Sequence, residues 1–127
     1  MKKTILVVDD NPLIRKMLGL ALGPSFALVD ADSADAALVE MNSVQPDGMV
    51  LDVMMPGTMN GFQLCERIKN DPLLKSIHVV MVTACGQEAD RALAMALGAD
   101  AYFVKPFSPV ELVDHFEKAL RPGECAS

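Results

Sequence analysis

Short apolar runs alternate with helix-like segments five times along this chain of 127 residues. The apolar runs, at 5–8, 26–29, 49–51, 79–82 and 102–104, have the length of buried strands. Strands that alternate with helices predict βα units around a parallel sheet, with helices on both faces. The run at 26–29 is short and partly polar, so we expect it to form an edge of the sheet.

Capping residues and a 3.6-residue spacing of apolar positions mark the helices. Asn11 followed by Pro12 predicts the start of the first helix. Ser108, Pro109 and Glu111 predict a capping box at the start of the last helix. We expect the helices at about 12–22, 34–42, 62–70, 87–97 and 109–120. The apolar residues on one face of the last helix are Val110, Val113, Phe116 and Leu120.

Length and composition predict a single domain at 1–121, followed by a short flexible tail at 122–127. Apolar residues make up 51% of the chain and charged residues 22%, which is typical of a globular protein. No apolar run approaches the ~20 residues of a membrane-spanning helix. The first predicted strand begins too close to Met1 to leave room for a signal peptide, so we expect a cytoplasmic protein that does not bind membranes.

Charge and cysteine content exclude further classes of function. The net charge of −6 argues against direct binding to nucleic acid, which needs clustered Lys and Arg. The three cysteines, Cys65, Cys85 and Cys125, form no C-x-x-C pair and are odd in number. This pattern argues against a disulfide framework and a zinc site, and it favours three reduced thiols.

Five polar residues follow the predicted strands at or just past their carboxyl ends: Asp9, Asp10, Asp52, Thr83 and Lys105. In an open parallel α/β sheet the carboxyl ends of the strands meet at one rim, and ligands bind there. We therefore expect three carboxylates, one hydroxyl and one ammonium group to lie close together. Taken singly, each residue has an ordinary explanation as a helix-terminal acid, a turn residue, a helix cap or a loop lysine. Five such coincidences on one rim are a poor explanation.

The chemistry of these five residues indicates a divalent cation and a phosphoryl group. Adjacent carboxylates resist joint ionisation unless a positive charge is near, and Mg²⁺ binds a few carboxylates while keeping some of its water. Three carboxylates and one lysine carry a charge of −2, which one divalent cation balances. The cation and Lys105 would hold phosphoryl oxygens as charge develops, and a carboxylate such as Asp52 can accept a phosphoryl group as an aspartyl phosphate.

The motifs around these residues resemble the receiver domain of bacterial response regulators, from residue 2 to about residue 120. The matching segments are ILVVDD at 5–10, LDVMMPG at 51–57, NGF at 60–62, VTA at 82–84, GADAY at 98–102 and KPF at 105–107. The resemblance implies a flavodoxin-like, doubly wound (βα)5 fold, a parallel five-stranded sheet of order 2-1-3-4-5.

By this resemblance, Asp52 accepts a phosphoryl group from the phosphohistidine of a sensor histidine kinase or a histidine phosphotransfer protein. Asp10, Asp52 and the backbone carbonyl of Met54 bind Mg²⁺, for which Mn²⁺ can substitute, and Asp9 assists through water. Lys105 contacts the phosphoryl group. The chain is then a signalling module whose chemistry is limited to its own phosphorylation and dephosphorylation, and its partner downstream is an effector protein or an output domain.

The resemblance also assigns roles beyond the transfer step. The backbone groups of Val53 and Ala84 contact the phosphoryl group, and Thr83 and Tyr102 form the switch. The switch alters the surface made by the fourth helix, the last strand and the last helix. The side chains predicted to tune the lifetime of the aspartyl phosphate are Met54 and Cys85.

A few positions depart from the family pattern. The loop between Asp52 and Gly61 is one residue longer than usual, with Thr58 as the extra residue, and Asn60 stands where an Asp is common. Ala101 and His115 replace an Asp and an Arg that dimerise many relatives through salt bridges. We expect His115 on the exposed side of its helix and His78 in a loop before the fourth strand.

Three other functions fit the sequence less well. A phosphohydrolase with an aspartate nucleophile would carry a second acid two residues after Asp52, where this chain has Met54. A pseudo-receiver that serves only for interaction would have lost one of the five rim residues, and all five are present. An FMN-binding flavodoxin would have a Ser/Thr/Gly-rich phosphate loop after its first strand, where this chain has Asp-Asp-Asn-Pro.

Overall fold

Five strands and five helices alternate along the part of the chain that the computed structural model describes, residues 2–54, 57, 59–84 and 88–120. The elements are β1 (Thr4–Val8), α1 (Pro12–Leu22), β2 (Ala27–Ala31), α2 (Ala34–Ser43), β3 (Gly48–Asp52), α3 (Gly61–Lys69), β4 (His78–Thr83), α4 (Glu88–Ala96), β5 (Ala101–Val104) and α5 (Pro109–Ala119). The tail at 121–127, the extra loop residue Thr58 and the start of the fourth predicted helix at Gln87 lie outside the described residues.

All neighbouring strands pair in parallel, in the order β2-β1-β3-β4-β5. This order confirms the expected doubly wound fold and places β2 at an edge, as the sequence predicts. The observed β2 begins one residue later and ends two residues later than the apolar run. Its pairing with β1 continues to Val8 and Ala31, so the partner strand sets the end of β2 and not its own composition.

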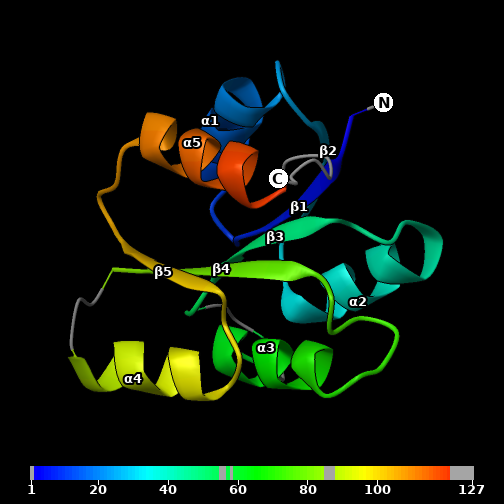
Figure 1. Cartoon of the computed structure of the whole chain (residues 1–127), viewed down its shortest axis with the longest axis vertical. Coiled ribbons are helices and arrows are strands. Elements are labelled where there is room, and N and C mark those ends of the chain that lie inside the picture. Colours follow the sequence, from blue (N-terminus) through cyan, green and yellow to red (C-terminus); the bar gives the residue numbers. More distant parts are fainter. Residues whose placement is uncertain (1, 55–56, 58, 85–87, 121–127) are drawn as a thin grey trace.

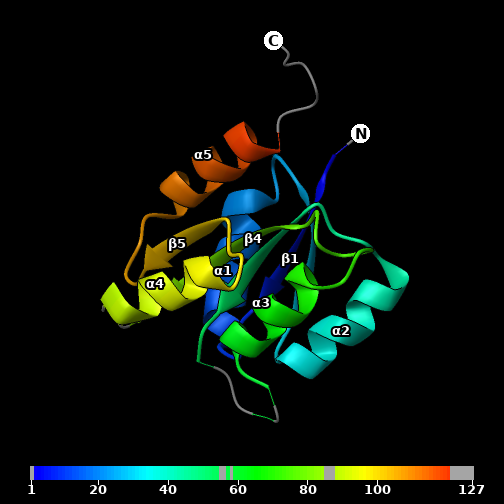
Figure 2. The same cartoon turned by 60° about the horizontal axis from the view of Figure 1, so that its bottom comes forward.

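The sheet is covered on both faces, and each face has its own core. Figure 1 shows α1 and α5 on one side of the sheet and α2, α3 and α4 on the other. Figure 2 shows α3 between α2 and α4 on that second side. Val7, Val50 and Val82 point toward α1 and α5, and Val8, Leu51 and Met81 point toward α2, α3 and α4. Because both faces are buried, the strands are continuous apolar runs and their polar residues lie at the ends.

One of the expected helix caps differs in the structure. Asn11 caps α1 as predicted, because its side chain accepts a hydrogen bond from the Leu13 N–H at 2.9 Å. Ser108 precedes α5, but its side chain makes no capping hydrogen bond, so the capping box predicted there is wrong. The capping box forms at α3 instead, where Asn60 and Gln63 each accept the other's backbone N–H at 2.9 Å.

The predicted environments of both histidines are wrong. His78 is the first residue of β4, and its Nε2 lies 2.8 Å from Nε2 of His115 on α5. The pair is half-buried, with the Phe116 ring against both imidazoles and the Phe103 ring against His115. Burial lowers the pKa of both histidines, which favours a neutral pair sharing one N–H.

The predicted apolar face of α5 is confirmed at Val113, Phe116 and Leu120, which pack on the core, and is wrong at Val110. Val110 is 75% exposed, whereas Leu112 and Phe116, four residues apart, are fully buried. Among the described residues, no helix combines the length and apolar composition that crossing a membrane requires.

The first residue of α3 is a glycine because the helix begins directly against β3. A Cβ at Gly61 would overlap the carbonyl oxygen of Asp52 and approach the Cα of Val53 to 2.8 Å. The Gly61 N–H also donates to the Val53 carbonyl at 3.0 Å, so the two backbones are in direct contact. This contact fixes the carboxyl end of β3, where Asp52 lies.

We predict that Gly61→Ala destabilises the fold by roughly 1–3 kcal/mol, because the new methyl group forces β3 and α3 apart. The matched control is Gly19→Ala within α1, where a Cβ meets no atom within 4 Å. That change should stabilise the helix by roughly 0.5–1 kcal/mol. Urea unfolding of both variants measures the difference, and equal effects of the two substitutions would contradict the prediction.

Candidate functional site

The rim residues predicted from the sequence lie at the carboxyl ends of four neighbouring strands. Asp52 and Thr83 are the last residues of β3 and β4, Asp9 directly follows β1, and Lys105 directly follows β5. The strand pairing aligns these ends, because Val8 pairs with Leu51, Asp52 with Val82 and Thr83 with Val104. Parallel pairing therefore brings together residues that are far apart in the sequence.

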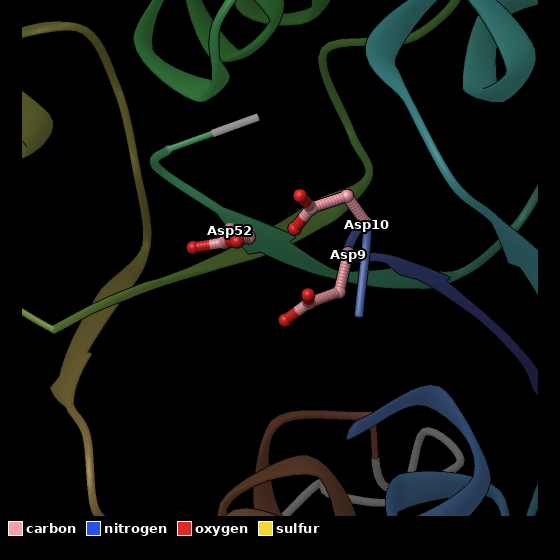
Figure 3. Close-up of side chains that lie close together, drawn as sticks. All are labelled: Asp9, Asp10 and Asp52. Atoms are coloured by element: carbon pink, nitrogen blue, oxygen red, sulfur yellow. The ribbon is translucent and has the colours of Figure 1, made fainter. Parts of the chain in front are cut away.

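Three carboxylates meet at this rim. Figure 3 shows the side chains of Asp9 and Asp10 leaving the end of β1 and turning toward Asp52 at the end of β3. One carboxylate oxygen from each residue lies within 4.8 Å of the other two. Asp9 and Asp52 are buried, with 3% and 6% of their surfaces exposed, whereas Asp10 is exposed. The cluster is therefore open to solvent on the side of Asp10.

Lys105 is the cation that bridges the two buried carboxylates. Its Nζ lies 3.3 Å from Oδ2 of Asp9 and 3.7 Å from Oδ1 of Asp52. The lysine is itself three-quarters buried, so these attractions are screened less than those of a surface pair. Asp9 also accepts the Asn11 N–H at its Oδ1, at 2.9 Å. Both oxygens of Asp9 are thus held in place.

The charge of Asp52 is poorly compensated. Burial raises the pKa of Asp52 from 3.8 to about 6, and repulsion from Asp9 and, less strongly, from Asp10 adds to the rise. Lys105 and the Met54 N–H, 3.4 Å from Oδ1 of Asp52, act in the opposite direction. One lysine does not balance three acids. The four side chains together carry a net charge of −2, as the sequence analysis expects.

The donor set fits a hard divalent cation. All the side-chain ligands at the rim are carboxylate oxygens, which Mg²⁺ and Mn²⁺ prefer. Asp10 makes no hydrogen bond or ion pair with another of the described residues, so it can turn toward a cation. The three carboxylates supply part of the ligand set of a cation, and the open side at Asp10 leaves room for water ligands.

The backbone N–H of Val53, which the sequence analysis expects to contact a phosphoryl group, is hydrogen-bonded within the sheet in this structure, and the expected contact stays a prediction. The Val53 N–H donates to the Val82 carbonyl at 2.9 Å and continues the pairing of β3 with β4. A contact from this N–H to a phosphoryl group would require that bond to open. The Met54 N–H already faces Asp52 and is better placed. Ala84, directly after β4, is exposed.

The two predicted switch residues lie on the same face of the sheet. Tyr102 pairs with Met81, and Met81 and Thr83 are two residues apart on β4, so all three side chains point toward α4. Thr83 is 1% exposed, and Tyr102 is half-buried. The guanidinium of Arg91 on α4 lies 5.7 Å from the centroid of the Tyr102 ring. Movement of either side chain would therefore change the packing between β4, β5 and α4.

Two residues at the site were not singled out in the sequence analysis. Arg15 on α1 donates from Nη1 to the backbone carbonyl of Asp9, and Arg91 packs on Tyr102. Both lie on helix surfaces where arginine is ordinary, so the sequence carried no signal for them. Of the two residues predicted to tune the phosphate lifetime, Met54 is 69% exposed and Cys85 lies outside the described residues. Their role stays a prediction.

Comparison with known proteins places this rim in a family context. Residues 5–117 match the model of the response regulator receiver domain. The chain is 40% identical over 126 residues to the phosphate regulon transcriptional regulatory protein PhoB of Pseudomonas aeruginosa, covering 96% of this chain and 55% of PhoB. It is 38% identical over 125 residues to the DNA-binding response regulator MtrA of Mycolicibacterium smegmatis, covering 98% and 53%. The chain thus spans about half the length of these curated relatives.

Solved structures show the same architecture. A putative response regulator from Chloroflexus aurantiacus superposes with a TM-score of 0.87 at 35% identity, covering 94% of this chain and 98% of the other. The chemotaxis protein CheY4 of Vibrio cholerae superposes with a TM-score of 0.85 at 26% identity, covering 93% and 98%. The BeF3-activated receiver domain of DrrB gives 0.87 at 27% identity, covering 94% and 98%.

The raised pKa of Asp52 predicts a pH-dependent stability. Because the folded-state pKa lies above that of the unfolded chain, the contribution of Asp52 is fully present below about 3.8 and is lost as the pH rises through about 6. Without a divalent cation, Asp52→Asn should therefore stabilise the protein by on the order of 2 kcal/mol at neutral pH and hardly at all in acid.

Urea unfolding in a chelating buffer measures this effect at several pH values. Glu66→Gln is the matched control, because it removes the charge of an exposed carboxylate on α3. The control should change the free energy of unfolding by less than about 0.5 kcal/mol at any pH. A gain for Asp52→Asn that does not vary with pH would contradict the assigned cause.

Proposed function

Because this chain belongs to the response regulator receiver domain family, whose members are phosphorylated on an aspartate in two-component signalling, we propose that Asp52 is its phosphoacceptor. The observation that carries the proposal is the position of Asp52. Its carboxylate lies at the end of β3, next to two further acids and within 3.7 Å of Lys105. This arrangement joins a nucleophile, cation ligands and a phosphoryl-binding ammonium group.

The transfer step follows from these side chains. A carboxylate oxygen of Asp52 attacks the phosphorus of a phosphohistidine and forms the new P–O bond. The P–N bond breaks, and its electron pair goes to the imidazole nitrogen of the donor. Lys105 leaves its position between Asp9 and Asp52 only slightly to meet the phosphoryl oxygens, because it already lies between the two carboxylates. The chemistry is directed at the chain itself, and hydrolysis of the aspartyl phosphate returns it to the resting state.

Asp10, Asp52 and the Met54 carbonyl would hold Mg²⁺, and Asp9 would act through water. Asp9 is the acid least able to move, since Asn11 and Lys105 hold its two oxygens. When bound, the cation offsets negative charge on the phosphoryl oxygens. The N–H groups of Met54 and Ala84 complete the set of phosphoryl contacts in this proposal, in place of the engaged Val53 N–H.

The signal would leave through the surface of α4, β5 and α5. A phosphoryl group on Asp52 draws Thr83 toward it, which makes room for Tyr102 behind it. Support comes from the position of Thr83 and Tyr102 on one face of the sheet, where Tyr102 lies next to Arg91 of α4. The change is a shift between two packings, and its extent is limited by the preference of the phosphoryl group for one of them.

The partners follow from the family assignment. A sensor histidine kinase or a histidine phosphotransfer protein would supply the phosphoryl group. An effector protein or an output domain would read the α4-β5-α5 surface, and among the relatives MtrA is named a DNA-binding response regulator. The cytoplasmic location stays a prediction.

The first test identifies the acceptor. Incubation with Mg²⁺ and a small phosphodonor should give one phosphate on the wild type, labile to hydroxylamine and located by mass spectrometry at Asp52. Asp52→Asn should carry none, because an amide cannot form the acyl phosphate. Glu66→Gln should be phosphorylated like the wild type. Hydroxylamine-labile phosphate that persists in Asp52→Asn would refute the assignment.

The second test concerns the cation. Mg²⁺ at 100 times its Kd should stabilise the wild type by about 2.7 kcal/mol. Asp10→Ala should raise the stability of the metal-free protein, because repulsion falls, and should abolish the effect of Mg²⁺. Thermal unfolding with and without Mg²⁺ measures both changes, with Glu66→Ala as the control for loss of an acid elsewhere. An undiminished response to Mg²⁺ in Asp10→Ala would contradict the ligand set.

A further inference from the structure

Arg15, in the first turns of α1, connects this helix to the carboxyl ends of β1 and β2. Its Nη1 donates to the backbone carbonyl of Asp9 at 2.7 Å, and its Nε lies 3.2 Å from Oδ2 of Asp30 on β2. The arginine side chain is only 20% exposed, whereas that of Asp30 is 62% exposed. The carbonyl contact is therefore the better protected of the two, and the Asp30 contact orients the guanidinium at its outer edge.

The carbonyl that Arg15 holds belongs to the peptide bond between Asp9 and Asp10. A peptide unit is planar, so fixing its oxygen also fixes the orientation of the Asp10 N–H and Cα. Asp9 is held at its other polar atoms as well: its N–H donates to the Ala31 carbonyl at 3.1 Å, Oδ1 accepts from Asn11, and Oδ2 pairs with Lys105. Arg15 therefore holds the peptide through which the backbone leads from Asp9 to Asp10.

We propose that Arg15 is a positioning residue that aims the Asp10 carboxylate at the cation, through the Asp9 carbonyl. This inference rests on the proposed function, because it assigns Asp10 to the metal. Among the described residues, the Arg15 side chain makes hydrogen bonds to Asp30 and to the Asp9 carbonyl and makes none to Asp10. Its effect on Asp10 would therefore be transmitted by the backbone. Groups that orient metal ligands in this way typically contribute 10–100-fold to metal affinity.

The charge of Arg15 acts in the opposite direction to its positioning role. A guanidinium near a cation site repels the cation, so its charge alone would weaken binding of Mg²⁺. Removing the Arg15 side chain then strengthens binding of Mg²⁺ if its charge is the main effect. It weakens binding if the orientation of Asp10 is the main effect. The sign of the change for Arg15→Met shows which effect is larger, and Arg15→Lys, which keeps the charge, isolates the positioning effect.

The experiment uses two variants and one control in the full chain. Arg15→Met removes the charge and both contacts but keeps an extended side chain. Arg15→Lys keeps the charge, but a single ammonium group cannot hold the Asp9 carbonyl and Asp30 with the geometry of the guanidinium fork. Lys16→Met, at the exposed neighbouring position, removes a charge from the same turn of α1 without touching Asp9.

Two readouts are measured on each protein. Calorimetric titration with Mg²⁺ gives the Kd, and the three-bond coupling between the amide and Cα protons of Asp10 reports its φ without metal. We expect both Arg15 variants to bind Mg²⁺ about tenfold more weakly and to shift the Asp10 coupling. Lys16→Met should keep the wild-type coupling and bind Mg²⁺ no more weakly than the wild type.

Tighter binding by Arg15→Met, with Arg15→Lys unchanged, would overturn the proposal in favour of a pure charge effect. A lower Tm with an unchanged Kd and coupling would also overturn it, since Arg15 would then only stabilise the fold. If the wild type itself binds no Mg²⁺, the proposed metal site fails, and the Asp10 coupling alone tests the positioning role of Arg15. A shifted coupling in both Arg15 variants supports that role, and an unchanged coupling refutes it.

Discussion

Repulsion among three carboxylates at one rim, opposed by a single lysine, is the constraint on which the rest of the structure depends. Asp9 and Asp52 are buried, and Lys105 bridges them at 3.3 and 3.7 Å. Despite this bridge, burial and then repulsion from Asp9 raise the pKa of Asp52 to about 6, so its charged form is unfavourable in the metal-free rim at neutral pH. A divalent cation would relieve this repulsion, and a phosphoryl group would bring new charge to the same place. Under the proposed function, both ligands would therefore act on the same charges.

The fold supplies the rigidity that such a strained site needs. Aligned parallel pairing fixes the ends of β1, β3, β4 and β5, and both faces of the sheet are covered by helices. The contact of Gly61 with the Asp52 carbonyl fixes the end of β3, and Arg15 on α1 holds the Asp9 carbonyl. Thr83 and Tyr102, the proposed switch residues, lie on the face toward α4.

The sequence predicted the features that repeat along the chain and missed those that depend on pairs of distant side chains. Polar residues that follow apolar strands predicted the rim, since strand ends in a parallel sheet have few alternatives. The partly polar run at 26–29 correctly predicted an edge strand. The contact of His78 with His115 could not be predicted, because it depends on the rotation of α5 over the sheet. The contacts of the Arg15 guanidinium and of the Val53 N–H with backbone carbonyls were also missed, because a residue type does not say which carbonyl it meets. The capping box at Ser108 failed because a motif gives the residues of a cap without their rotamers.

The pKa of Asp52 tests the central claim most directly. The carboxyl carbon of Asp52 can be followed by ¹³C NMR as the pH is varied, in the presence of a chelator and then with Mg²⁺. Strain at the rim predicts a metal-free midpoint at about 6 and a clear fall when Mg²⁺ binds. A metal-free midpoint at 3.8, unchanged by Mg²⁺, would contradict the account, because the three carboxylates would then neither repel one another nor need a cation.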